Sequence, residues 1–308
     1  MKSKITPLYM LTFSYAVFSF AVYSPYKNMS IYDWLKVFLI GTAIGVVAIV
    51  VAFHKKTISN WVQYVLMVYL IFLLSSKIYA VWRYTKMYHS RGTADAIMIV
   101  TAIFILIFVA YPYIEVKRFA IPLFIFSLML IAFAILFNSS KINRYNLYMH
   151  IKNTVFKHEY RVTMFDYTVP FMLLGNKTKS SNQKNMILIF VLINFILVLV
   201  TLVTFSCFRG DFMYSISPLQ IAFQLSSTNS IRNFDGLFSF LLILAYFATI
   251  LLILWSLSQL NLKIKYRFLF LVPVIVAFMP NISEVYFFIR QILIILFMRI
   301  GVVHIEKR

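Results

Sequence analysis

Residues 236–260 read GLFSFLLILAYFATILLILWSLSQL, a run that contains no charged side chain. A helix needs about 20 predominantly apolar residues to cross the ~30 Å hydrocarbon core of a bilayer, so this stretch is long enough to span a membrane. Lipid offers no hydrogen-bond partner to the backbone, and the apolar residues are continuous rather than alternating. The stretch is therefore predicted to be a transmembrane helix.

Similar runs occur on both sides of this stretch. The chain has 308 residues, 62% of them hydrophobic, and its mean hydropathy of +0.87 is far above that of a soluble domain. These features predict an all-α polytopic membrane protein that forms a single transmembrane domain over residues 1–308. About ten helices are expected, most of them long enough to span a bilayer, at residues 5–24, 34–53, 61–81, 94–114, 119–138, 162–175, 186–207, 236–260, 267–279 and 284–303. The segment 162–175 is too short to cross as one straight helix.

The charge distribution predicts how these helices are oriented. The net charge of +20 comes from 29 Lys and Arg against 9 Asp and Glu, and short basic loops are typical of the cytoplasmic side and of contact with anionic headgroups rather than with nucleic acid. The N-terminus is therefore predicted to be cytoplasmic. The basic segment Lys141–Arg161 would then be external, and the second half of the chain would invert if 162–175 did not cross. The loops predicted to be cytoplasmic are 54–60, 115–118, 176–185 and 261–266.

The sequence gives little support for enzymatic chemistry. The single cysteine, Cys207, excludes an intramolecular disulfide, and no Cys/His cluster has the spacing of a zinc site. Glycine-rich phosphate loops, HExxH, GxSxG and paired carboxylates are also missing from the sequence. We therefore predict a protein that is not an enzyme and that has no cofactor or metal.

Ionisable residues inside the predicted spans need a physical reason, because each costs about 2.5–3.5 kcal/mol or more at the centre of a helix. Lys77 and Arg299 are predicted to lie close enough to a helix end for the charge to reach the interface. Arg290 lies deeper, and both a buried charge partner and a functional role are open for it.

The segment 162–175 is the sharpest candidate for a binding site. It is short, contains Asp166 next to Tyr167 and Thr168, and is interrupted by Pro170. Proline removes a helix hydrogen bond, and the carbonyls and helix ends at such breaks coordinate ions or zwitterions. The alternative is an aspartate in a loop at the membrane surface.

The first predicted span is polar for its depth. It carries Ser14, Tyr15 and Ser19 before a predicted helix break at Pro25. These hydroxyls are candidate ligand-binding groups, although serine and threonine hydroxyls also commonly bond to their own helix backbone.

Several short motifs resemble one family. Ten spans with breaks in the first and sixth resemble the LeuT-type fold of the amino acid–polyamine–organocation (APC) superfamily. Within it, the chain resembles the GerAB-type spore germination proteins, which are the B subunits of spore germinant receptors. The matching residues are Ile5-Thr6-Pro7 ("ISP"), Trp34 at the start of the second span, Tyr113 to Arg118 ("GIEVIAR"), Met164-Phe165-Asp166 ("GFE"), Ser217-Pro218 and Phe234-Asp235-Gly236-Leu237-Phe238 ("YP…RLDALF").

The resemblance implies a membrane subunit that senses a small, amino acid-like nutrient between the first and sixth helices. Asp166 would face a cationic group, while Ser14, Tyr15, Ser19, Tyr167 and Thr168 would supply polar contacts. The implied partners are the A and C subunits of the receptor, in the spore inner membrane. Two alternatives stay open: an amino acid or cation transporter of the same superfamily, and a ligand-free scaffold in which Phe18 and Phe20 fill the space of the family's glycines.

Overall fold

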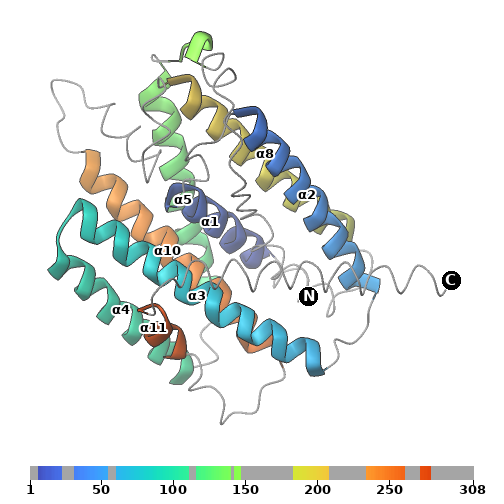
Figure 1. Ribbon diagram of the computed structural model, residues 1–308, viewed down its shortest axis with the longest axis vertical. Coiled ribbons are helices and arrows are strands. Elements are labelled where there is room, and N and C mark those ends of the chain that lie inside the picture. Colours follow the sequence, from blue (N-terminus) through green and yellow to red (C-terminus); the bar gives the residue numbers. More distant parts are fainter. Residues whose placement is uncertain are drawn as a thin grey trace. The chain divides into compact units, whose positions relative to one another are not determined.

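The computed structural model describes residues 6–22, 31–54, 60–110, 116–139, 142–146, 183–207, 234–260 and 271–278, which are almost entirely helical (Figure 1). The prediction of a helical fold is confirmed for this part of the chain. The helices are α1 (Thr6–Val22), α2 (Ile31–His54), α3 (Asn60–Tyr88), α4 (Arg91–Ala110), α5 (Val116–Asn138), α8 (Gln183–Cys207), α10 (Phe234–Gln259) and α11 (Val272–Val276).

Five of the described helices are long and apolar enough to cross a membrane, as expected of a helical integral membrane protein. They lie at Gln63–Tyr88, Arg91–Ala110, Arg118–Leu136, Lys184–Thr204 and Gly236–Gln259. The predicted spans 162–175 and 284–303 lie outside the described residues, as does part of 267–279. The ten-span count and the LeuT-type arrangement therefore stay predictions.

The ends of the third and fourth helices differ from those predicted. Helix α3 continues to Tyr88 rather than stopping at residue 81, and α4 begins at Arg91 rather than at residue 94. The predicted ends are those of the apolar run, but a helix can continue into the headgroup layer when its last turns carry amphipathic side chains. At the other side of the turn, the Ser90 hydroxyl accepts a hydrogen bond from the Thr93 N–H at 3.1 Å. This bond is a helix N-cap, and it fixes where α4 starts.

The described helices gather in two compact units. One contains α1, α2 up to Val46, α5 from Lys117, α8 from Asn185 and α10 up to Thr249. The other contains the rest of α2, α3, α4, the end of α10 and α11.

In the first unit, α1 packs against both α5 and α10. The rings of Phe13 and Phe124 meet edge to face with centroids 5.2 Å apart, and those of Phe18 and Tyr246 lie 5.6 Å apart. Aromatic pairs at these separations stabilise a core beyond the area they bury. Helix α1 is therefore an interior helix of its unit.

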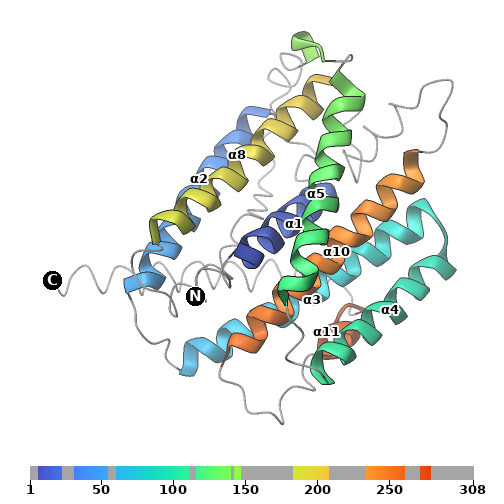
Figure 2. The same ribbon diagram turned by 180° about the vertical axis from the view of Figure 1, so that it is seen from behind.

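The C-terminal end of α8 is held by the segment that follows α5. The Ser206 carbonyl accepts one hydrogen bond from the Asn143 N–H and another from the Asn146 side-chain amide, both at 2.9 Å. Carbonyls in the last turn of a helix have no partner within the helix, so these bonds satisfy a group that the helix leaves open. As a result, the C-terminal ends of α5 and α8 lie together (Figure 2).

This contact predicts that the C-terminal ends of α5 and α8 face the same side of the membrane. Cys207 is the chain's single cysteine, so it serves as a native reporter for α8. We expect a membrane-impermeant maleimide to label Cys207, and Ser139→Cys in a Cys207→Ser background, from one side. In the same Cys207→Ser background, Arg118→Cys and Lys184→Cys, which lie at the helix starts, should be labelled from the other side. Labelling of Cys207 and Ser139→Cys from opposite sides would contradict this topology.

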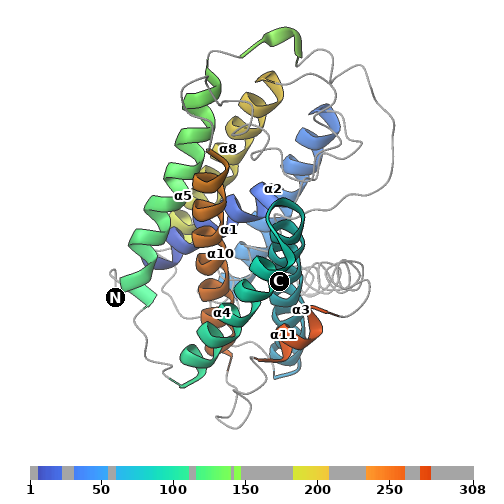
Figure 3. The ribbon, with the colours of Figure 1, turned by 90° about the vertical axis from the view of Figure 1, so that its left-hand side faces the viewer.

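In the second unit, α3 and α4 form an antiparallel hairpin, and α11 packs beside α3 (Figure 3). The connection is only His89 and Ser90, and the His89 N–H bonds to the Thr85 carbonyl at 2.9 Å. A connection this short forces the two helices to lie side by side in opposite directions.

Candidate functional site

Helix α1 presents its polar side chains to the protein interior. Thr12, Ser14, Tyr15 and Ser19 are all buried, and so are the apolar residues between them. A helix on the lipid-facing surface would expose an apolar face instead. The structure thus places the three predicted α1 residues, Ser14, Tyr15 and Ser19, in the interior of one unit.

Ser14 connects α1 to α5. Its hydroxyl oxygen lies 3.1 Å from the Met10 carbonyl oxygen of its own helix and 3.4 Å from the Leu123 carbonyl oxygen of α5. A hydroxyl has one proton, so it donates to one of these carbonyls at a time, and its lone pairs stay available to accept a hydrogen bond. The Ser14 hydroxyl can therefore accept a hydrogen bond while it donates to a backbone carbonyl.

The Leu123 carbonyl also accepts a second hydroxyl. Ser127, one turn further along α5, donates to it at 2.8 Å and is fully buried. On α1, the Thr12 hydroxyl donates to the Leu8 carbonyl at 2.7 Å. Such bonds from a hydroxyl to its own helix hold the side chain in a fixed rotamer.

Phe18 also lies in this interior. Its ring is fully buried and lies against Tyr246 of α10. The Phe20 side chain is not among those that the structure describes.

The other half of the predicted site lies outside the described residues. This applies to Asp166, Tyr167 and Thr168, to the predicted helix breaks at Pro25 and Pro170, and to Arg290. Their proximity to α1 therefore stays a prediction.

The structure corrects the prediction for Lys77. Because α3 ends at Tyr88 rather than at residue 81, Lys77 lies about 16 Å from that end along the helix axis at 1.5 Å per residue. Its side chain is only 1% exposed and is one of the largest fully buried side chains. The protein therefore encloses this side chain, which does not extend to an exposed helix end. The polar triplet Ser75-Ser76-Lys77 within an apolar run was the sequence signal for this interior position.

The long apolar helices and the buried hydroxyls of α1 are those of a helical membrane protein with a polar helix in its interior. Among the described residues, no group of three or more His, Cys, Asp or Glu side chains could hold a metal ion. No family model matches the chain, and no curated protein sequence matches it.

Proposed function

We propose that this chain is a membrane subunit of a spore germinant receptor and that it senses a small, amino acid-like nutrient next to α1. The observation that carries the proposal is the buried set of hydroxyls on α1, with Ser14 able to accept a hydrogen bond from a ligand. The motif resemblance supports the same reading. Receptor A and C subunits are the proposed partners, and the spore inner membrane is the proposed location.

Ligand sensing in this proposal follows from differential binding. A nutrient shifts a bundle between two arrangements only if it binds one of them more tightly. Ser14 also lies within reach of the Leu123 carbonyl, so its contacts depend on the spacing of α1 and α5. A ligand ammonium that bonds to the Ser14 hydroxyl would therefore favour one spacing of these helices over another.

Spores that carry Ser14→Ala test the proposal. A hydrogen bond to a charged group contributes about 1.5–3 kcal/mol, so the nutrient concentration for half-maximal germination should rise about tenfold or more. The matched control is Ser127→Ala, which removes the other buried hydroxyl bonded to the Leu123 carbonyl.

The readout is germination against a panel of amino acids, with subunit abundance measured in the inner membrane and a deletion strain as baseline. Ser127→Ala should leave the response within about twofold of the parent, because its hydroxyl is not a proposed ligand contact and its loss lowers stability by only about 1 kcal/mol. Equal shifts in the two variants, or no shift in Ser14→Ala, would contradict the proposal.

A second candidate function is that of a ligand-free scaffold subunit. The burial of Phe18 against Tyr246 favours it, since these rings fill space near the α1 hydroxyls.

The transporter alternative is distinguished by uptake in reconstituted vesicles, where a symporter would dissipate an ion gradient as it accumulates its substrate.

A further inference from the structure

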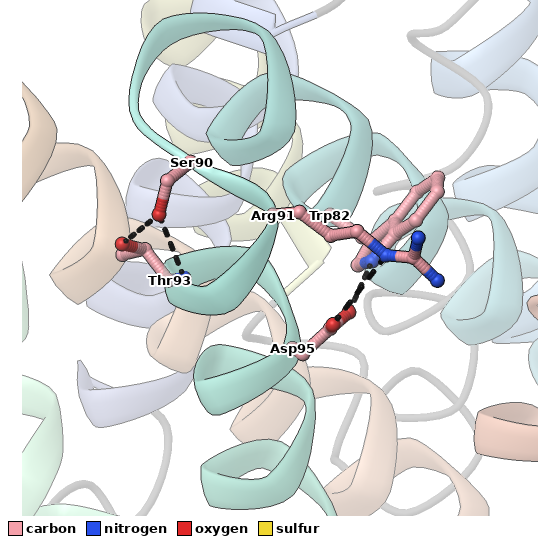
Figure 4. A network of polar contacts seen from close by, with 5 residues as sticks. All are labelled: Trp82, Ser90, Arg91, Thr93 and Asp95. Carbon is pink, nitrogen blue, oxygen red and sulfur yellow. Dashed lines mark hydrogen bonds and ion pairs between the residues drawn. The ribbon is translucent and has the colours of Figure 1, made fainter.

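A polar and aromatic cluster lies at the turn between α3 and α4 (Figure 4). The Trp82 indole N–H donates to Asp95 Oδ1 at 3.2 Å, and Arg91 Nε lies 3.9 Å from Asp95 Oδ2. Asp95 therefore joins the two helices of the hairpin and compensates the charge of Arg91. We call this cluster, together with Arg83 and Lys86, the hairpin turn cluster.

The Trp82 ring is held on several sides. Tyr79 stacks near it on α3, Phe278 meets it edge-on from the segment after α11, and Lys86 Nζ lies 4.7 Å from the ring centroid. A cation over an indole face is attracted by the ring quadrupole. The indole is thus fixed in position, with its polar edge toward Asp95.

The turn lies at the depth of the lipid headgroups if the hairpin crosses the membrane. Helix α3 has 29 residues, which corresponds to a length of about 43 Å, whereas the hydrocarbon core is only ~30 Å thick. Its apolar run ends near residue 81, so its last two turns are the part that extends beyond the core. Tryptophan and tyrosine at such positions are typical of the membrane interface.

The hairpin carries more positive charge than its own carboxylate can compensate. Asp95 is the single acidic residue in the sequence 60–110, and it is already engaged by Arg91 and Trp82. Arg83 and Lys86 are both exposed. The N-terminal end of α4 adds partial positive charge at the same place.

We propose that the hairpin turn cluster binds the phosphate of an anionic phospholipid, with Arg83 and Lys86 as the cationic contacts. Trp82 sets the depth at which the headgroup meets these side chains. Two features favour a lipid over a soluble anion: the end of two long apolar helices at the turn, and the interfacial aromatic residues beside the charges.

The test uses the full-length chain, purified in detergent. Its apparent unfolding temperature is measured with phosphatidylglycerol and with phosphatidylcholine of the same acyl chains, and lipid adducts are counted by native mass spectrometry. We expect phosphatidylglycerol to give the higher temperature and the more abundant adducts. The double variant Arg83→Gln/Lys86→Gln should lose about half or more of that difference. Its unfolding temperature in phosphatidylcholine should stay close to the parental value, because both side chains are exposed and the contact of Lys86 with Trp82 is weak at an exposed site.

The matched control is Lys36→Gln/Lys184→Gln, which removes the same charge from two exposed lysines on other helices. This control should keep the parental difference between the lipids. Equal losses in the two double variants would overturn the proposal, as would a parent that does not distinguish the lipids. An equal stabilisation by inorganic phosphate would show a soluble anion site instead.

Discussion

Replacing Lys77 by glutamate is expected to prevent the chain from accumulating in the membrane. Lys77 is 1% exposed in the middle of α3. Lysine offers hydrogen-bond donors, and buried polar groups are almost always bonded, so the surroundings of Lys77 supply acceptors. An ionised carboxylate has no proton to donate to them, and an uncompensated buried charge costs about 3–5 kcal/mol. That cost is comparable to much of the stability of a typical domain.

The control is the same charge reversal at Lys184, near the start of α8. That side chain is exposed, and surface substitutions usually change stability by less than about 0.5 kcal/mol. Immunoblots of membrane fractions should therefore show Lys184→Glu at close to the parental amount and Lys77→Glu strongly depleted. Equal amounts of the two variants would mean that the Lys77 environment accepts a negative charge.

The second large effect is expected for Phe18→Ala. The Phe18 ring is fully buried against Tyr246, and truncation of a buried phenylalanine costs about 3–5 kcal/mol through lost burial and the cavity left behind. The apparent unfolding temperature of the purified chain should fall clearly. The matched control is Phe119→Ala, because Phe119 is 46% exposed on α5 and leaves no interior cavity.

The same pair of variants also separates two of the functions considered for the chain. If the chain is a scaffold whose interior is filled by Phe18, a cavity at this position should create binding of a small amino acid that the parent lacks. If the chain is a sensor, Phe18→Ala should weaken an existing response. A fall in stability no larger than that of Phe119→Ala would contradict the interior placement of the Phe18 ring.

The sequence predicted most of the helices because the bilayer imposes a simple requirement of length and apolarity. Residues 236–260, for example, were predicted as a helix, and α10 extends over Phe234–Gln259. Helix ends were harder to predict, since hydropathy marks the end of the apolar run rather than the end of the backbone hydrogen bonding. Trp82, Arg83 and Lys86 lie beyond the apolar run of α3 but still within the helix.

The candidate site was predictable only in part. The hydroxyls of Ser14 and Ser19 were recognised because polar residues are conspicuous in an apolar run, and both are buried. The Leu123 carbonyl that faces Ser14 and the Tyr246 ring that packs on Phe18 were not predicted. Both contacts join residues far apart in the chain, and the hydropathy of a helix does not indicate which neighbour it packs against.

The attachment of residues 142–146 to α8 has a consequence for how this chain can diverge. One of the two donors to the Ser206 carbonyl is the backbone N–H of Asn143, and the acceptor is also a backbone group. A main-chain bond of this kind survives replacement of either side chain, except by proline at position 143. Homologous chains could thus lose all recognisable similarity in this segment and still keep the same junction, so its conservation would be visible in a comparison of structures but not in an alignment of sequences.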